Sequence, residues 1–260
     1  MFCKNFAKGF FIAALLSAAT VDTRLPDAAQ QGDKLAVQNL LNQKVDVNAQ
    51  QGDGMTALHW AAANDDLELA QLLLSAGAKV DAATRLGGIM PIFLACKNGD
   101  AALIEALIKA GAGANAPDAH GTTPLMVAAG IGWGYHYSMN APDSWMAAVK
   151  YCVELGADVN AVDDRGYTAL HGAAYLGNHE MINYLMEKGA DIKAVAKDKN
   201  TVADMANGPT RFGIPHPETV AMLEKLGSAN SHNCRSDQCL VAPKEDKKPA
   251  ASATAKPDQN

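Results

Sequence analysis

Aromatic side chains are scarce in this chain of 260 residues, at 6% of the sequence, although 48% of the residues are hydrophobic. Ala and Leu dominate the apolar content instead. Strands favour aromatic and β-branched residues, whereas Ala and Leu are strong helix formers. The composition therefore favours close-packed helices over a β-sandwich, and its apolar content is that of a chain that folds.

Basic residues are in the minority, with 22 Lys and Arg against 28 Asp and Glu. Without residues 1–19 the chain loses Lys4 and Lys8, which leaves 20 basic against 28 acidic residues and a formal charge of −8. Such an acidic surface repels phosphate backbones and anionic lipid. We therefore expect no nucleic-acid partner.

The apolar run near the N-terminus is short. It covers residues 10–19, about half of the roughly 20 residues that a membrane span needs, and it follows the basic Lys4 and Lys8. Small residues at Ser17 and Ala19 complete the pattern of a secretory signal peptide. We expect cleavage after Ala19 and a periplasmic or secreted protein without stable membrane insertion. The alternative is an uncleaved N-terminal segment that anchors the protein in a membrane.

Cysteine is rare, with five residues in the chain. In an oxidising compartment Cys234 and Cys239 can close a small disulfide loop. The alternative is a zinc site that joins these thiols to His216 or His232. Because the sequence has no CxxC pair, we expect neither a metal nor a cofactor.

Catalytic motifs are absent as well. The sequence has no nucleophile elbow accompanied by His and Asp, no HExxH metal motif and no phosphate-cradling glycine loop. We therefore expect a protein that is not an enzyme.

What the sequence has instead is an internal repeat of about 33 residues. Gly-Ala pairs begin at Gly77, Gly111, Gly156 and Gly189, at spacings of 34, 45 and 33 residues, and a segment like Asp158–Ala161 follows each pair. We count six units between residues 22 and 227. The outer two are degenerate, which suits the caps of a linear stack, because each end must turn one face to water.

Each unit carries the pattern of two helices. The first follows a Thr that can cap exposed N–H groups, as at Thr56, Thr123 and Thr168, and contains an Ala pair that lets neighbouring units approach closely. The second has aliphatic residues at helical spacing, such as Leu69 and Leu73.

Two segments, 56–62 and 168–174, read Thr-Ala-Leu-His-x-Ala-Ala, and residues 156–161 read Gly-Ala-Asp-Val-Asn-Ala. These motifs resemble the ankyrin repeat. The resemblance covers residues 22–227 and implies an all-α solenoid of about six helix-turn-helix units joined by short β-hairpin-like loops. It also implies a structural hydrogen-bonding role for His59 and His171.

An insertion at residues 133–146 lengthens the fourth unit by 12 residues and is rich in aromatic side chains. Aromatic residues with a polar group are enriched at binding hot spots, but they also fold loops back onto helices as a small core. Both roles stay open at this point for Trp133, Tyr135, His136, Tyr137 and Trp145.

The ankyrin resemblance further implies that hairpin tips and exposed positions of the first helices contact a protein partner. The tips differ from unit to unit while the helices repeat, as expected of a surface that is free to specialise. The candidate contact residues at the tips are Met55, Arg85, Ile89, His120, Arg165 and Tyr167.

The other cysteines fall within the repeat. Cys96 takes an Ala position of a first helix and Cys152 an aliphatic position of a second helix. We expect both to be small buried hydrophobes in neighbouring units, with no disulfide between them.

The repeat pattern ends at Gly227. Residues 228–260 form a Cys-containing linker and a Pro-, Ala- and Lys-rich tail, whose apolar content is too low to offset the entropy of ordering. The whole chain thus predicts an exported, monomeric ankyrin-repeat scaffold of bacterial type that binds another protein. Two alternatives are an accessory protein that binds a small ligand or redox partner through the insertion, and a secreted effector.

Overall fold

Twelve short helices form the part of the chain that the computed structural model describes, which comprises residues 22–132, 142–208, 214–231 and 235. In chain order they are α1 (Arg24–Gln30), α2 (Lys34–Asn42), α3 (Ala57–Ala63), α4 (Leu67–Ser75), α5 (Pro91–Asn98), α6 (Ala101–Lys109), α7 (Pro124–Ala128), α8 (Pro142–Glu154), α9 (Ala169–Tyr175), α10 (His179–Glu187), α11 (Val202–Ala206) and α12 (Pro217–Leu226).

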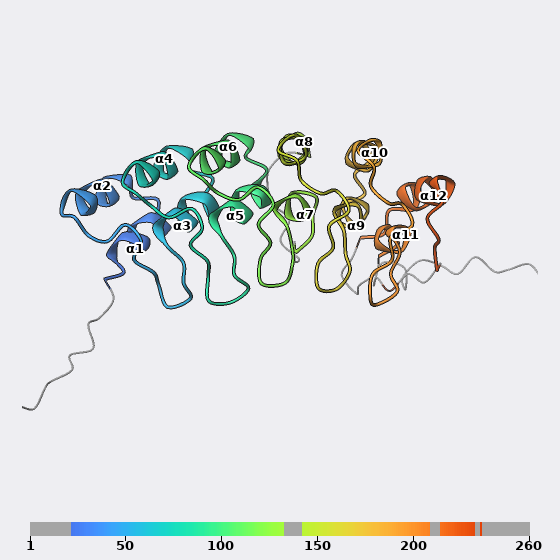
Figure 1. Cartoon of the computed structure of the whole chain (residues 1–260), viewed down its shortest axis with the longest axis horizontal. Helices are drawn as coiled ribbons and strands as arrows, with labels where there is room; N and C mark the ends of the chain where they lie inside the picture. Colours follow the sequence, from blue (N-terminus) through green and yellow to red (C-terminus); the bar gives the residue numbers. More distant parts are fainter. Residues whose placement is uncertain (1–21, 133–141, 209–213, 232–234, 236–260) are drawn as a thin grey trace, which may run out of the picture.

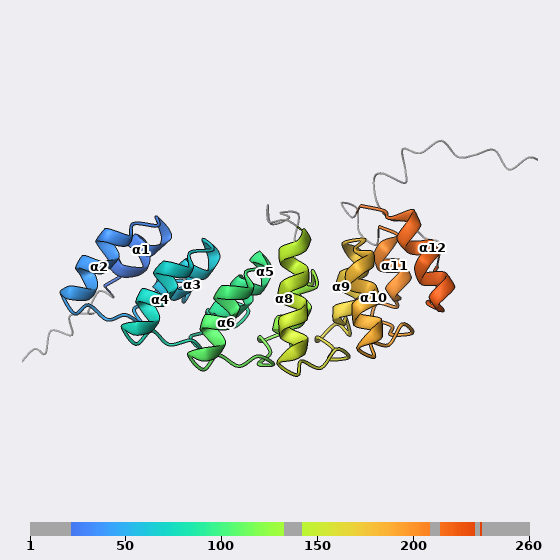
Figure 2. The same ribbon diagram turned by 90° about the horizontal axis from the view of Figure 1, so that it is seen from above.

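Consecutive helices pair into six helix-turn-helix units that stand in one row (Figure 1). Odd-numbered helices form an inner layer, even-numbered helices form an outer layer, and the loops between units project from the inner layer. Seen from above, the row follows a shallow arc (Figure 2). Described residues contain two isolated β-bridges but no strand, so the expected all-α repeat solenoid is confirmed.

Short polar side chains start the helices of both layers. Each accepts a hydrogen bond from a backbone N–H of the first turn, which would otherwise lack a partner. In the outer layer the capping residues are Asp33, Asp66, Asp100 and Asn178. In the inner layer Thr56, Thr123 and Thr201 take this role. Local sequence therefore fixes where most units begin.

Alanine and leucine fill the space between units. Ala61 and Ala62 of α3 are fully buried, so the neighbouring inner helices can approach closely. Leu73 of α4 and Leu107 of α6 are fully buried at the same repeat position of the outer layer. Burial of one such Leu stabilises the fold by roughly 1.5–3 kcal/mol, and each unit obtains it only by packing on its neighbours.

The fourth unit departs from this pattern. Its inner helix α7 has 5 residues and its outer helix α8 has 13, whereas α4, α6 and α10 have 9. Residues 133–141 of the insertion lie outside the described residues, but residues 142–146 form the first turn of α8. The insertion thus lengthens an outer helix at its N-terminal end.

The last unit is closed by the chain that follows it. Asp204 of α11 accepts hydrogen bonds from the backbone N–H and the hydroxyl of Ser231, at 2.8 and 2.7 Å. The Ser228 hydroxyl accepts another from the Ala203 N–H at 3.0 Å. None of the described helices is both long and apolar enough to cross a membrane.

Candidate protein-binding surface

Backbone hydrogen bonds join each hairpin tip to the next. In every case a carbonyl of one tip accepts from an N–H of the following tip, across five successive loops. The donor and acceptor pairs are Arg85 to Asp53 at 2.8 Å, Ala119 to Gly87 at 3.0 Å, Asp164 to His120 at 2.7 Å and Lys197 to Arg165 at 2.8 Å. The tips therefore form one connected edge of the molecule, which we call the tip row.

Exposed side chains of the tip row include Arg85, His120 and Arg165, three of the residues expected to contact a partner. His120 Nδ1 lies 3.2 Å from the Asp164 carboxylate of the next tip. The Arg165 guanidinium pairs at 2.8 Å with Asp163, whose side chain is fully buried. These contacts hold the charged groups in place, so they lose little conformational freedom when a partner binds.

Leu86 is the residue that sequence reasoning missed. It lies in the hairpin that opens the third unit and is 83% exposed, the most exposed of the large hydrophobic side chains described. Its hairpin closes between the Thr84 N–H and the Ile89 carbonyl, one residue wider than the hairpin from Asp118 to Thr122. The double glycine that follows Leu86 in the sequence is the signal that marks this wider tip.

Tyr167 was expected at the surface, and the structure corrects this expectation. The side chain is 9% exposed, its hydroxyl donates to Asp198 of the next unit at 2.6 Å, and its ring meets the His171 ring edge-on at 5.4 Å. Because the residue packs between two units, it is not available to a partner. The equivalent Met55 and Ile89 are half-buried, and Ile89 packs against the core.

His59 connects its own helix to the next hairpin. Its Nδ1 accepts from the Thr56 N–H at 3.2 Å, which places the ring proton on Nε2. Nε2 then donates to the Ile89 carbonyl at 2.9 Å. Burial lowers the pKa of His59, although the hydrogen bond to Ile89 opposes the shift. The side chain is therefore a neutral part of the scaffold.

His171 repeats only the Nδ1 contact in the fifth unit, because its buried Nε2 lacks a hydrogen-bond partner among the described residues. Its Nδ1 accepts from the Thr168 N–H at 3.1 Å, and the side chain is completely buried. Burial lowers the pKa of His171 to about 4, while the backbone of Asn200 acts in the opposite direction. Both histidines are buried and bonded to the Thr that precedes their helix, which accounts for a structural role.

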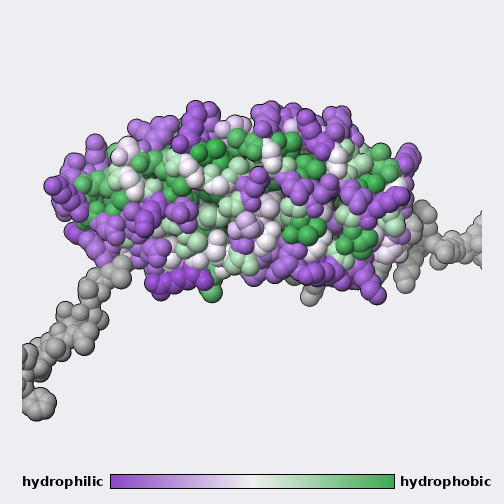
Figure 3. All heavy atoms as spheres, viewed as in Figure 1, coloured by the Kyte–Doolittle hydropathy of each residue, from purple (hydrophilic) through white to green (hydrophobic). Residues whose placement is uncertain are grey.

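Three apolar side chains line the inner helices beside the tip row. Trp60, Leu94 and Val127 occupy the same position of α3, α5 and α7 and are each partly exposed. The Trp60 indole donates to Gln51, in the hairpin that opens the second unit, at 2.7 Å, which shows that this position faces the hairpins. We call these residues the inner-helix row. In Figure 3 the more hydrophobic residues lie mainly in a band along the middle of the row, between hydrophilic upper and lower edges.

The predicted aromatic insertion lies only partly within the described residues. Trp133, Tyr135, His136 and Tyr137 lie outside the described residues. Trp145 is 9% exposed in α8, and its ring lies so close to Gly99 that a Cβ at that glycine would be 2.7 Å from it. Trp145 was expected to contact a partner, and the structure corrects this expectation. Because its side chain is buried, Trp145 packs within the protein instead.

Cysteine and metal-binding groups add no catalytic site to the described residues. Cys96 and Cys152 are buried free thiols, while Cys234 and Cys239 lie outside the described residues. Across the described ranges no three His, Cys, Asp or Glu side chains are grouped to hold a metal ion.

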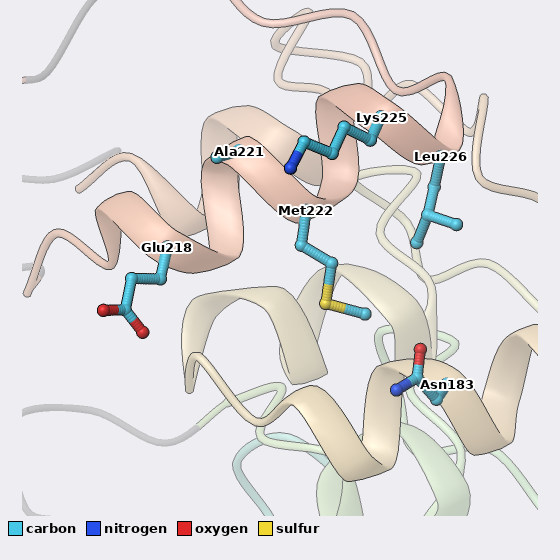
Figure 4. A pocket seen from close by; sticks show the side chains of 6 residues that line it. All are labelled: Asn183, Glu218, Ala221, Met222, Lys225 and Leu226. Atoms are coloured by element: carbon cyan, nitrogen blue, oxygen red, sulfur yellow. The ribbon is translucent and has the colours of Figure 1, made fainter.

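A hollow of about 560 Å³ opens between α10 and α12 at the C-terminal end of the row. Figure 4 shows the Met222 side chain extending from α12 toward α10, beside Asn183. Glu218, Lys225 and Leu226 complete its wall on α12. The hollow is a gap between two outer helices, and its polar lining residues are Asn183, Glu218 and Lys225.

Comparison with known proteins supports the repeat. Two family models described as ankyrin repeats match this chain, one at residues 66–137 and 92–196 and the other at residues 25–74. Palmitoyltransferase AKR1 of Lachancea kluyveri is 27% identical over 175 residues, 65% of this chain and 22% of its own length. Ankyrin repeat and SOCS box protein 6 of Homo sapiens is 32% identical over 140 residues, 51% of this chain and 31% of its own length.

A third relative, ankyrin repeat and SAM domain-containing protein 6 of Rattus norvegicus, is 34% identical over 113 residues, 43% of this chain and 11% of its own length. The chain thus spans less than a third of the length of each of these relatives. The family match is broader, since it runs from residue 25 to residue 196. With well over half of its residues matched in this way, the chain belongs to the ankyrin-repeat family.

Proposed function

We propose that this protein is an exported scaffold that binds another protein through the tip row and the inner-helix row. Ankyrin repeats indicate protein–protein interaction, and this chain carries six units of that kind. The single observation that carries the proposal is the connected tip row, which presents exposed Arg85, Leu86 and Arg165 on a hydrogen-bonded edge. Preorganised side chains of this kind lower the entropy cost of binding.

Leu86 is the proposed anchor. An apolar side chain that is 83% exposed gains most from burial by a partner, and the neighbouring Arg85 offers a guanidinium for a carboxylate or an aromatic ring. The inner-helix row lies beside the tips and supplies further apolar area through Trp60 and Leu94. We propose binding as a monomer, with the interaction surface on the side of the hairpins.

Export is the second part of the proposal. The basic residues and short apolar run of residues 1–19 support a secretory signal peptide. We propose that this peptide directs the protein to the periplasm or out of the cell. Some relatives are named palmitoyltransferases, but this chain spans 22% of the length of the one from Lachancea kluyveri. We propose a binding function without catalysis for this chain, supported by the match of its repeats alone.

A photo-crosslinking residue at position 86 tests the proposed surface inside the producing cells. Position 35 is the matched control, because Leu35 is also highly exposed, at 74%, but lies on outer helix α2. We expect a specific adduct from position 86 and none from position 35. Equal adduct patterns from the two positions would contradict the proposal.

The dissociation constant of the partner found in this way is then measured for two variants of this protein. Arg85→Ala combined with Leu86→Ser is expected to weaken binding at least about tenfold, whereas Leu35→Ser leaves the dissociation constant unchanged. Fractionation and N-terminal sequencing of the mature protein test export. A chain recovered from the cytosol with Met1 or Phe2 at its start would overturn that part.

A further inference from the structure

Two cysteines replace an Ala and a Leu of the repeat. Cys96 stands where the neighbouring units have Ala62 and Ala129, and Cys152 stands where they have Leu107 and Leu185. All six of these positions are buried to 2% exposure or less. Neither packing position requires sulfur, so the pair adds a chemical group that the scaffold itself does not need.

The fold brings the helices of the two cysteines together. Inner helix α5 of the third unit packs directly on outer helix α8 of the fourth. Trp145 and Cys152 are seven residues apart on α8 and therefore lie on the same face, which is the buried one. Trp145 rests against Gly99 at the end of α5, one turn beyond Cys96, so this face of α8 runs along α5.

The neighbouring Cys152 side chain and burial raise the pKa of the Cys96 thiol well above its usual range. Both sulfurs are buried in the packed core, where they are slow to react as long as the units stay closed. The sequence predicted two buried cysteines without a disulfide, and the structure shows both as free thiols. The stacking of the third and fourth units brings their helices together.

We propose that Cys96 and Cys152 form a disulfide that links the third unit to the fourth when the protein meets an oxidising thiol–disulfide environment. The link closes the chain segment 97–151, which contains the whole insertion of the fourth unit. A closed loop of this length restricts the unfolded chain and so stabilises the stack. The link reaches the fourth unit, whose inner helix α7 has only 5 residues.

The oxidant is a small or protein disulfide, RSSR. When the units open transiently, one cysteine loses its proton to water and its thiolate attacks RSSR, which forms a mixed disulfide and releases one thiolate RS⁻. The second cysteine, also as a thiolate, attacks the first cysteine's sulfur and releases the second RS⁻. Two protein thiols are oxidised and one RSSR is reduced to two RSH, which take up the two protons.

The experiment uses the full chain with Cys3→Ser, Cys234→Ser and Cys239→Ser, so that Cys96 and Cys152 are its remaining cysteines. This protein is unfolded in urea and refolded in a buffer of oxidised and reduced glutathione, or in dithiothreitol. We expect the oxidised sample to lose both alkylatable thiols and to yield a linked peptide that contains Cys96 and Cys152. Its melting temperature should rise by about 5–10 °C and return after reduction.

The matched control is the same chain with Cys96→Ala and Cys152→Leu, which restores the Ala and Leu of the neighbouring units. This variant should fold with the same circular dichroism spectrum and melt at one temperature in both buffers. Two alkylatable thiols in a natively folded oxidised sample would overturn the proposal. A linked sample that melts below its reduced form would also overturn it, because the disulfide would then oppose the native stack.

Discussion

The hydroxyl of Tyr167 donates a 2.6 Å hydrogen bond to the carboxylate of Asp198, and this contact ties the hairpin of the fifth unit to that of the sixth. Asn200 donates to the same hydroxyl at 3.2 Å and to the same carboxylate at 2.8 Å. Burial and the Asp198 contact raise the pKa of Tyr167, so the phenol stays protonated and acts as a donor. This bridge adds a side-chain link to the backbone bonds of the tip row.

Tyr167→Phe is expected to lower the free energy of unfolding by about 1–2 kcal/mol, because it removes the bridge while the ring remains packed. Urea denaturation followed by circular dichroism measures the loss. Tyr184→Phe is the matched control, since the Tyr184 ring lies on outer helix α10 under Lys188. Equal losses in both variants would show that the bridge does not stabilise the stack.

Acid should weaken the fold through its buried histidines. The pKa of His171 is lowered to about 4 by burial, so between its unfolded value of about 6.5 and pH 4 the unfolded chain binds a proton that the folded chain does not. The contribution of His171 to the free energy of unfolding is thus fully present above about pH 6.5 and is lost as the pH falls toward 4. We expect a loss of about 2 kcal/mol between about pH 7 and pH 5.

Urea titrations at these two pH values check this dependence. The pKa of His59 is lowered by burial as well and contributes with the same sign. His171→Gln is expected to be less stable at neutral pH but to show a shallower fall toward acid. An unchanged pH slope in this variant would contradict the assignment of the slope to His171.

Trp145→Ala should destabilise the protein rather than weaken binding. The ring is 9% exposed and fills the space beside Gly99, so its removal leaves a cavity between the third and fourth units. A loss of about 3–5 kcal/mol in the free energy of unfolding is expected. Leu86→Ala, at an exposed tip, should change stability by less than about 0.5 kcal/mol, and thermal melts of both variants give the comparison.

Gly172→Ala reverses the usual effect of alanine in a helix. Alanine has the higher helix propensity by about 1 kcal/mol, yet a Cβ at Gly172 would lie 2.5 Å from the Ala129 carbonyl oxygen of the neighbouring inner helix. We expect a net loss of about 1–3 kcal/mol, measured by urea unfolding. At Gly52 an added Cβ meets no atom within 4 Å, so Gly52→Ala should be close to neutral. A Gly172→Ala protein more stable than the parent would disprove the close approach.

The repeat and its helices were predictable because their signals are local. Thr123 and Asp100 cap helices that begin one residue later, and the buried faces recur at helical spacing within each unit. The same reasoning identified Arg85, His120 and Arg165 at exposed tips. These features depend on residues a few positions apart, which a sequence displays directly.

Contacts between units could not be found in this way. Tyr167 and Ile89 follow a tip glycine at the same repeat position, but only the stacked neighbour decides that Tyr167 is buried against Asp198. The exposure of Leu86 depends likewise on the wider hairpin from Thr84 to Ile89. Sequence position alone does not distinguish a side chain that faces solvent from one that a neighbour covers.

The sequence by itself thus determined the ankyrin repeat, its number of units and the starts of several helices, since capping and hydrophobic periodicity act within one unit. The tertiary structure decided which parts of the chain meet across units, including Trp145 with Gly99 and the helices that carry Cys96 and Cys152. Such pairs lie up to 56 residues apart in sequence and become neighbours only when each unit covers the apolar face of the one before it.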